Sequence, residues 1–269
     1  MKKINPEIFK DQYKVKDGKY IFIPVQEEVV TDFLDKIKYK IKKFNKIYSA
    51  LIEIISPVYP QPFFDAKRII RNEIRGKEVV ALNLGSGNSD FGDDLLNVDL
   101  LPYQNVDVIC DIENIPFKDN SVDYIINIAV LEHVPNPQKV IAEIHRVLKP
   151  GGKIYCFIPF MQPFHASPYD FQRFTFEGMK HQFKDFEILN LKPVGPTSGM
   201  LWVVQEWFAL VFSFGIKPLH TFLYLLFMIL TFPIKFLDVI LQYYPMSKNM
   251  ASGFSIYAQK KIKHGKDSK

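Results

Sequence analysis

The apolar positions of the chain follow two periodicities, and their order along the sequence predicts the fold. Between Asn136 and Leu148 the apolar residues recur at helical spacing. Strands that alternate with helices specify an open, doubly wound α/β sheet of the Rossmann-like class, in which ligands bind beyond the carboxyl ends of the strands. Short apolar runs of the kind that buried parallel strands need occur at 79–84, 97–100, 106–110, 122–129 and 153–159.

The region before this core has a different pattern. Asp17 and Gly18 stand between β-forming residues and predict a hairpin. From Thr31 to Ile55, apolar residues at helical spacing alternate with lysines, which indicates either the solvated face of a packed helix or a basic amphipathic helix lying on anionic lipid. Three prolines within 57–62 end that helix.

The region after the core is strongly apolar over 202–214 and 218–241. The run from Leu219 to Ile234 is shorter than the roughly 20 residues of a membrane-spanning helix, and Pro233 interrupts its end. We therefore expect a monotopic or re-entrant helix pair on a membrane surface, with burial in a dimer interface as the soluble alternative. Ser255–Ala258 is the last predicted strand.

Composition bounds the function without deciding it. The 48% hydrophobic content of the 269 residues suffices for one large core with an appendage. A net charge of +5 is mild and no nucleic-acid module is visible, so we expect no nucleic-acid partner. Cys110 and Cys156 stand in apolar runs, and no signal-peptide pattern follows Met1, which favours a reducing, cytoplasmic location.

The same patterns divide the chain into five segments. They are a hairpin leader (1–30), a basic helix with a proline-rich linker (31–76), the sheet domain (77–195), a hydrophobic helical extension (196–245), and a C-terminal strand with a basic tail (246–269).

Glycines and carboxylates at successive strand ends predict a nucleotide-cofactor site. Gly85, Ser86 and Gly87 follow the first run directly, where backbone must approach a ligand closely. Asp99 ends the second run, where a carboxylate can accept hydrogen bonds from a ribose diol, and Asp111 ends the third. Turn or cap chemistry is the alternative for both carboxylates. An NAD site shares the pattern, but its glycine-to-acid spacing is longer.

The motifs LNLGSG, NVDL, DIENIPFKDNSVDYI, LEHV and HRVLKPGG, over about residues 78–160, resemble class I S-adenosylmethionine-dependent methyltransferases of the type 11 group. The flanks SPVYP and PFMQPFHASPYDFQRFT are similar to a subset associated with bacterial surface-glycan gene sets. The chain departs from the family pattern at Asn83, where aspartate is commoner, and at Ser89, which replaces a third glycine. Only residues 88–98 separate Gly87 from Asp99, so we expect the first helix to be short or absent.

The resemblance implies S-adenosylmethionine as cofactor and a role for each matched residue. Gly85 and Gly87 would let the turn run against the methionine part, with Ser86 meeting its carboxylate. Asp99 would take the ribose hydroxyls. The remaining implied contacts are Asp111 and Ile112 at the adenine edge, and Asn127, Ile128, Glu132 and His133 around the sulfonium end.

The loop 160–175 follows the last core strand and therefore overhangs the same edge of the sheet. Methyl transfer to a hydroxyl needs a general base of near-neutral pKa and in-line placement, which histidine can supply. His165 is the first candidate and His133 the second, with Asp170 and Arg173 near in sequence. The alternatives are structural histidines and an ion pair that only shapes the loop.

We therefore expect a cytoplasmic, membrane-associated, S-adenosylmethionine-dependent methyltransferase. The proposed acceptor, a sugar, glycan or lipid-linked hydroxyl, rests on the resemblance alone. The alternative is a non-catalytic membrane-associated accessory module that keeps the fold. No metal site is expected, and the leader has no cysteine for a zinc ribbon.

Overall fold

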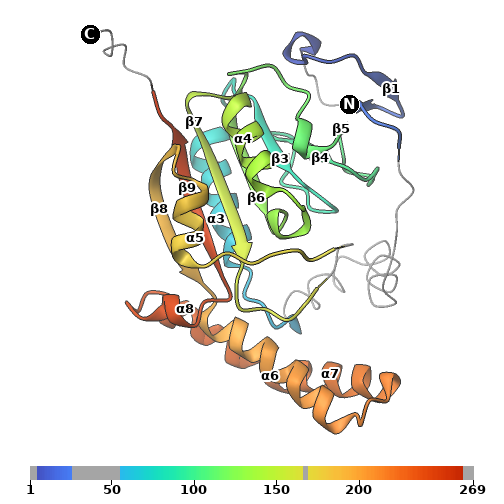
Figure 1. The fold of residues 1–269 in the computed structure, drawn as a ribbon, viewed down its shortest axis with the longest axis vertical. Helices are drawn as coiled ribbons and strands as arrows, with labels where there is room; N and C mark the ends of the chain where they lie inside the picture. The colour runs from blue at the N-terminus through green and yellow to red at the C-terminus, as the bar shows by residue number, and fades with distance from the viewer. Residues whose placement is uncertain (1–4, 26–54, 166–168, 263–269) are drawn as a thin grey trace.

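A computed structural model describes residues 5–25, 55–165 and 169–262 (Figure 1). The predicted basic helix lies outside the described residues except for Ile55. Nine strands form one sheet, in the order β1-β2-β5-β4-β3-β6-β7-β9-β8. Their bounds are β1 Lys14–Lys16, β2 Lys19–Ile21, β3 Ala81–Leu84, β4 Leu96–Asp99, β5 Val108–Ile109, β6 Val122–Ile128, β7 Leu148–Pro159, β8 Phe186–Val194 and β9 Gly253–Lys260.

The centre of the sheet is parallel, as the apolar runs predict. Strand β3 pairs in parallel with β4 on one side and with β6 on the other, and β6 pairs in parallel with β7. Strand β9 runs antiparallel to both β7 and β8. All four strands β3, β4, β6 and β7 are mostly buried, because helices cover both faces. The predicted Rossmann-like α/β fold is confirmed.

Helices form the layers on either side of the sheet (Figure 1). Helix α4 buries Val140, Ile141, Ile144 and Val147 in the larger core, whereas α3 and the π-helical turn after it pack on the other face. The helices are α3 Gln61–Ile69, α4 Pro137–Val147, α5 Phe176–Gln182, α6 Pro196–Phe212, α7 Lys217–Thr231 and α8 Asp238–Leu241. Short turns are η1 Pro6–Ile8, η2 Ile70–Ile74, η3 Ile112–Asn114, η4 Leu131–His133, η5 Phe232–Leu237 and η6 Ser247–Asn249.

The predicted leader hairpin is present and extends the sheet. Strands β1 and β2 pair antiparallel, and Asp17 and Gly18 both have positive φ, as a tight hairpin turn requires. Strand β2 also pairs in parallel with β5. Phe9 is buried against Phe117, with ring centroids 5.0 Å apart. The leader therefore shares the core of the sheet domain.

No helix lies between β3 and β4, where residues 85–95 form turns. The expectation of a short or absent first helix is confirmed. Side-chain hydrogen bonds hold this segment: the Asn83 amide donates to Ser89 O at 3.2 Å and to Asn97 Oδ1 at 2.9 Å. The Asn105 amide donates to the same Ser89 carbonyl at 2.9 Å. A loop held by buried amides takes the place of a helical crossover.

Arg146, in the HRVLKPGG motif, ties helix α4 to the loop that carries the IPFKD sequence. Its guanidinium donates to the carbonyls of Ile115 and Phe117 at 2.7 and 2.8 Å. It also pairs with Glu143 and Asp119 at 2.7 Å each. The two motifs, which both contribute to the methyltransferase resemblance, are therefore in direct contact, and this contact is structural.

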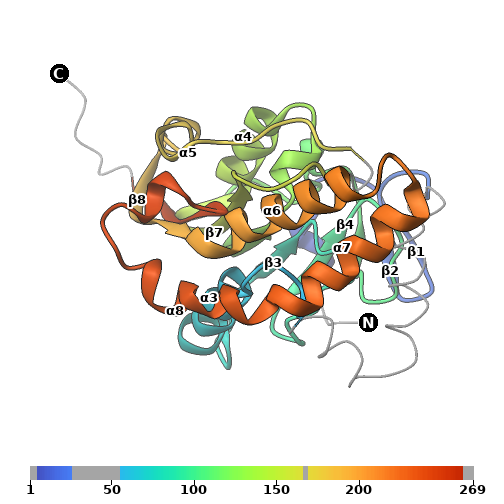
Figure 2. The same ribbon diagram turned by 90° about the horizontal axis from the view of Figure 1, so that it is seen from below.

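Helices α6 and α7 form an antiparallel hairpin that extends beyond the sheet (Figures 1 and 2). The Gln205 amide donates to Thr231 Oγ1 at 2.7 Å, and His220 Nε2 lies 3.3 Å from Glu206 Oε1. At the base of the hairpin, the buried Asp238 accepts hydrogen bonds from the amides of the first turn of α6. These contacts hold α6, α7 and α8 together.

The helical run Lys217–Leu241 has 25 residues, so it is longer than the sequence indicates and long enough to cross a membrane by length and composition. Two charged residues in its second half are nevertheless buried inside the protein. Lys235 is 1% exposed and donates to Ser56 O at 2.6 Å, and Asp238 is fully buried. As expected from Pro233, the α-helix itself ends before it, at Thr231.

Candidate functional site

The site lies where the parallel strands end. Because β3 pairs with β4 and β6 in parallel register, the carboxyl ends of the three strands lie side by side. The amides of Gly85 and Ser86 both donate to Val98 O, at 2.8 and 3.1 Å, so the glycine turn continues the β3–β4 pairing. The turn is thus held at the edge where the sequence places it.

Gly85 cannot carry a side chain in this structure. Its φ is +71°, and a Cβ atom there would lie 2.5 Å from two Cγ atoms of Val130. Gly87 also has a positive φ, of +50°, but a Cβ atom there would meet nothing within 4 Å. The turn therefore packs closely against the end of β6 at Gly85 and leaves open space at Gly87.

Asp99 lies at the end of β4 and joins the glycine turn. Its Oδ2 accepts from Gly87 N at 2.7 Å and its Oδ1 from Leu101 N at 2.9 Å. Burial raises the pKa of Asp99 above its usual value, and hydrogen bonds from the backbone of Leu101, Gly87 and Leu100 oppose that rise. These hydrogen bonds stabilise the turn, which is the alternative role that the sequence allows for Asp99. They also fix the carboxylate beside the open space at Gly87.

Asp111 caps the short helix η3. Its Oδ1 accepts from Glu113 N at 2.8 Å, while the residue itself is exposed. Ile112, beside it, is 8% exposed and belongs to the large core, so only its backbone could meet a ligand.

The two residues predicted at the end of β6 face the protein interior. Asn127 is fully buried; its amide donates to Leu84 O at 3.0 Å and its Oδ1 lies 3.3 Å from Cys156 Sγ. Ile128 packs in the core cluster under α3. Asn127 thus ties β6 to the end of β3, and Ile128 is half-buried beside it.

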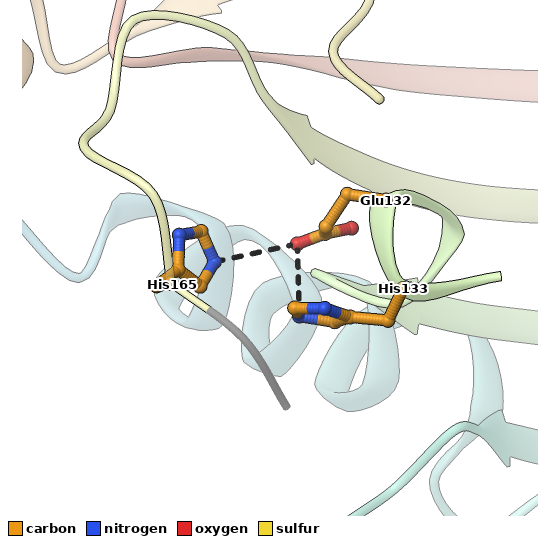
Figure 3. Close-up of side chains that lie close together, drawn as sticks. All are labelled: Glu132, His133 and His165. Atoms are coloured by element: carbon orange, nitrogen blue, oxygen red, sulfur yellow. Dashed lines mark ion pairs between the residues drawn. The ribbon is translucent and has the colours of Figure 1, made fainter. Parts of the chain in front are cut away.

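The turn after β6 and the loop after β7 bring Glu132, His133 and His165 together (Figure 3). His133 Nε2 lies 3.6 Å and His165 Nε2 3.9 Å from Glu132 Oε1. The two imidazole rings are 5.4 Å apart and edge to face. Both predicted histidines are therefore in one cluster, and Glu132 is its centre.

Glu132 is fully buried, and neither carboxylate oxygen has a hydrogen-bond partner among the described residues. Burial raises its pKa to about 8, although its own backbone amide and Arg173 act in the opposite direction. An unpaired buried carboxyl is costly, and such groups concentrate at functional sites.

Backbone contacts orient the two imidazole rings. His133 Nδ1 donates to Tyr169 O, and His165 Nδ1 lies 3.2 Å from Pro163 O. Arg173 Nη2 also lies 3.3 Å from His165 Nδ1, a contact that would need the opposite tautomer. We assign the proton to Nδ1, because Pro163 O is the nearer of the two partners and can only accept. Burial lowers the pKa of both histidines, which leaves them neutral at pH 7.

Asp170 and Arg173 shape the loop that carries His165. They form a two-pronged ion pair, and Asp170 Oδ2 accepts from His165 N at 3.0 Å. Phe171 N donates to Glu132 O at 2.8 Å, which joins the loop to the turn after β6. Asp170 and Arg173 therefore form an ion pair that shapes the loop and positions His165, which is the alternative role that the sequence allows for them.

Trp202 belongs to the cluster, although no sequence motif singles it out. It comes from α6, and its ring lies 5.6 Å from the ring of His165. Only the folded chain brings the hydrophobic extension to this site, because α6 begins next to β9 at the same edge. Glu132, by contrast, could be found from the sequence, because it belongs to the LEHV motif.

Known proteins match the part of the chain that carries the glycine turn, Asp99, Glu132 and His133. Residues 70–156 match the family model described as a methyltransferase domain. The chain is 37% identical over 75 residues to the ubiquinone/menaquinone biosynthesis C-methyltransferase UbiE of Rickettsia prowazekii, a match that covers 25% of this chain and 30% of that protein. It is 38% identical over 82 residues to the biotin biosynthesis bifunctional protein BioHC of Cellvibrio japonicus, covering 30% and 15% respectively.

The chain thus spans less than a third of the length of these curated relatives. The family model and the UbiE relative support the class I methyltransferase resemblance of the motifs; the glycan-associated subset is not shown. Among solved structures, MccD protein is 11% identical with a TM-score of 0.48, covering 76% of this chain and 100% of that one. Haemonchus contortus phosphoethanolamine N-methyltransferase 2 is 18% identical with a TM-score of 0.44, covering 76% and 53%.

The raised pKa of Glu132 predicts a pH dependence of stability. The folded protein keeps this proton from the usual pKa of 4.5 up to about 8, whereas the unfolded chain loses it. Raising the pH through this window therefore destabilises the fold, by about 1.4 kcal/mol per pH unit at most. E132Q carries a neutral group of the same shape, so its free energy of unfolding relative to the wild type should rise by on the order of 4 kcal/mol from pH 4.5 to 8.

The measurement is chemical denaturation of both proteins across this pH range with a chelator present. His133, His165, Arg173 and Asp170 also face Glu132, but they remain in both proteins and largely cancel in the difference. If the difference in free energy of unfolding between E132Q and the wild type stayed constant with pH, the pKa of Glu132 would not be raised by folding.

Proposed function

We propose that the chain is an S-adenosylmethionine-dependent methyltransferase whose cofactor lies at the glycine turn and whose acceptor lies at the Glu132–His133–His165 cluster. The observation that carries this proposal is that the glycine turn and the cluster lie at the same edge of the sheet. Gly85 packs on Val130, which is two residues before Glu132. A methyl donor and an acceptor must be adjacent for in-line transfer. The match of residues 70–156 to a methyltransferase domain supports the same conclusion.

The glycine turn fits the cofactor. Open space beside Gly87 is bordered by the Asp99 carboxylate, and Asp111 is exposed at the neighbouring strand end. The Asp99 carboxylate accepts hydrogen bonds from backbone amides and, with about four acceptor sites, retains capacity for a ribose hydroxyl. Gly85, Ser86 and Gly87 would hold the methionine part, and the Asp111 side chain with the Ile112 backbone the adenine. When bound, S-adenosylmethionine supplies an electrophilic methyl group.

The acceptor side needs a base, and His165 is the one we propose. Its Nε2 carries the lone pair once Nδ1 donates to Pro163 O, and burial keeps the pKa of the ring below its usual value, so the ring can accept a proton at pH 7. His133 is oriented in the same way and is the second candidate. Asp170 and Arg173 hold His165 in place and do not themselves move a proton.

A hydroxyl of a sugar, glycan or lipid-linked glycan is the acceptor that we propose. Imidazoles and a carboxyl beside Trp202 form a polar site with an aromatic wall, which suits a sugar ring. The relative UbiE is named a C-methyltransferase, and carbon is therefore the competing acceptor atom. The competing class of function is a non-catalytic accessory module, which would not transfer a methyl group to any acceptor.

The α6–α7 hairpin supports attachment to the cytoplasmic surface of a membrane. Only 11% of the apolar stretch of Lys217–Leu241 is buried, and large apolar side chains are exposed along both helices. Because Lys235 and Asp238 are buried in the protein, the hairpin would lie in the interface and would not cross the bilayer. Exposed apolar residues of the hairpin are Trp207, Leu210, Val211, Phe212, Phe214, Phe222, Leu225, Leu226, Ile229 and Leu230.

The cofactor site predicts different effects at two glycines. G85A should weaken binding of S-adenosylhomocysteine about 10- to 100-fold, because the new methyl overlaps Val130 and overpacking costs about 1–3 kcal/mol. G76A is the matched control: its φ of +72° causes the same backbone strain, but nothing lies within 4 Å of its Cβ position. Isothermal titration measures both affinities. If G85A and G76A bound S-adenosylhomocysteine equally well, the glycine turn would not be part of the cofactor site. If the wild type gave no heat of binding, the accessory module would be favoured.

The acceptor site predicts a loss of turnover without a loss of cofactor. H165A should reduce methyl transfer at least about 100-fold, the usual contribution of a positioned base, while S-adenosylhomocysteine still binds. The assay is tritiated-methyl transfer to membrane and polysaccharide extracts. H181A, an exposed histidine on α5, serves as the control and should leave turnover unchanged. Near-normal turnover of H165A would exclude His165 as the base.

Membrane attachment predicts a distribution that depends on the hairpin. The wild type should sediment with membranes, resist high salt and dissolve in detergent. A triple variant, F222S with L226S and L230S, removes exposed apolar area from α7 and should become at least about tenfold more soluble. V15S removes an exposed apolar side chain from the leader and should change nothing. A wild type that stays soluble and dimerises would place the hairpin in a subunit interface instead.

A further inference from the structure

The cluster Glu132, His133 and His165 has the composition and spacing of a metal site. We propose that these three side chains bind a divalent transition-metal ion of the zinc type. Carboxylate and imidazole are common zinc ligands, and a site with three protein ligands keeps a coordination position for another molecule. No metal is expected from the sequence, because His165 lies 32 positions after His133 and meets it only in the folded chain.

The distances suit a cation at the centre of the cluster. Ligand atoms about 2.1 Å from a tetrahedral zinc ion lie about 3.4 Å from one another. The two imidazole Nε2 atoms are 3.6 and 3.9 Å from Glu132 Oε1, and the three ligand atoms all lie within 4.8 Å of one another. Side-chain shifts of a few tenths of an ångström to about one ångström would close the site.

The burial of Glu132 is an independent observation that points to a cation. The residue is fully buried, and its two oxygens accept no hydrogen bond from the part of the chain that the structure describes. A buried carboxylate is normally paired with a positive group or bound to a metal. The nearby cation Arg173 is instead paired with Asp170. Figure 3 shows the Glu132 carboxylate directed at the space between the two imidazole rings.

The imidazole rings are oriented as metal ligands usually are. A histidine that binds a metal through Nε2 commonly donates its Nδ1 proton to a backbone carbonyl or a carboxylate, which fixes the tautomer. His133 does this with Tyr169 O, and His165 with Pro163 O. The Nε2 lone pairs of both rings then face Glu132.

The ligand set selects the class of metal. Two imidazoles suit zinc, iron or cobalt better than magnesium, which prefers oxygen ligands in octahedral geometry. If the proposed methyl transfer is correct, a metal ion on His165 Nε2 would occupy the lone pair that accepts the acceptor's proton, and the bound metal would act as an inhibitor of methyl transfer. Only this role rests on the proposed function; the metal site does not.

The test uses the full chain, stripped with a chelator and dialysed, and titrated with Zn²⁺ by calorimetry. The wild type should bind one equivalent, and Co²⁺ in its place should give the visible absorption of a low-coordinate site. E132Q and H165A should each bind Zn²⁺ more weakly by more than the roughly 10- to 100-fold that the loss of an outer-shell partner costs. Mg²⁺ in excess should not displace Zn²⁺.

H220Q is the matched control, because His220 also lies beside a carboxylate, at 3.3 Å from Glu206, but in the α6–α7 hairpin. Its Zn²⁺ affinity should equal that of the wild type. No Zn²⁺ binding by the wild type, or unchanged binding by E132Q and H165A, would overturn the proposal. Thermal unfolding of the metal-free variants shows that they are folded. Titration of S-adenosylhomocysteine on the same samples separates failure of the metal site from failure of the proposed methyltransferase function.

Discussion

The parallel pairing of β3 between β4 and β6 is the constraint on which the rest of the structure depends. Parallel register places Leu84, Asp99 and Ile128 at one edge of the sheet, so that every segment that follows a strand begins there. The glycine turn, the Asp99 carboxylate and the turn that carries Glu132 are neighbours for this reason. Gly85 is required because the β3 and β6 ends approach closely enough that a Cβ atom would overlap Val130.

Polar groups in the interior hold this edge together where helices do not. The missing helix between β3 and β4 is replaced by hydrogen bonds from Asn83 and Asn105 to the Ser89 carbonyl. Asn127 joins the end of β6 to Leu84, and Arg146 joins α4 to the loop before β6. Several residues of the sequence motifs thus maintain the scaffold.

The acceptor side of the edge is electrostatically unusual. A buried carboxyl with no hydrogen-bond partner in the described part of the chain lies between two neutral imidazoles, and the ion pair of Asp170 with Arg173 fixes the loop around them. The same arrangement can serve a proton transfer through His165 or the binding of a cation by all three side chains. Helix α6 closes this side with Trp202, so the hydrophobic hairpin and the site are parts of one structure.

The sequence by itself determined the features that depend on local pattern. Apolar runs predict the parallel strands, Asp17-Gly18 the hairpin, and the short interval between Gly87 and Asp99 the missing helix, because strand burial, turn geometry and chain length are local properties. Only the tertiary structure decided the rest. Asn127 is buried against Leu84 because β6 pairs beside β3, and Glu132 meets His165 because a loop after β7 folds over the turn after β6. Contacts between segments distant in sequence have no periodicity that a pattern could reveal.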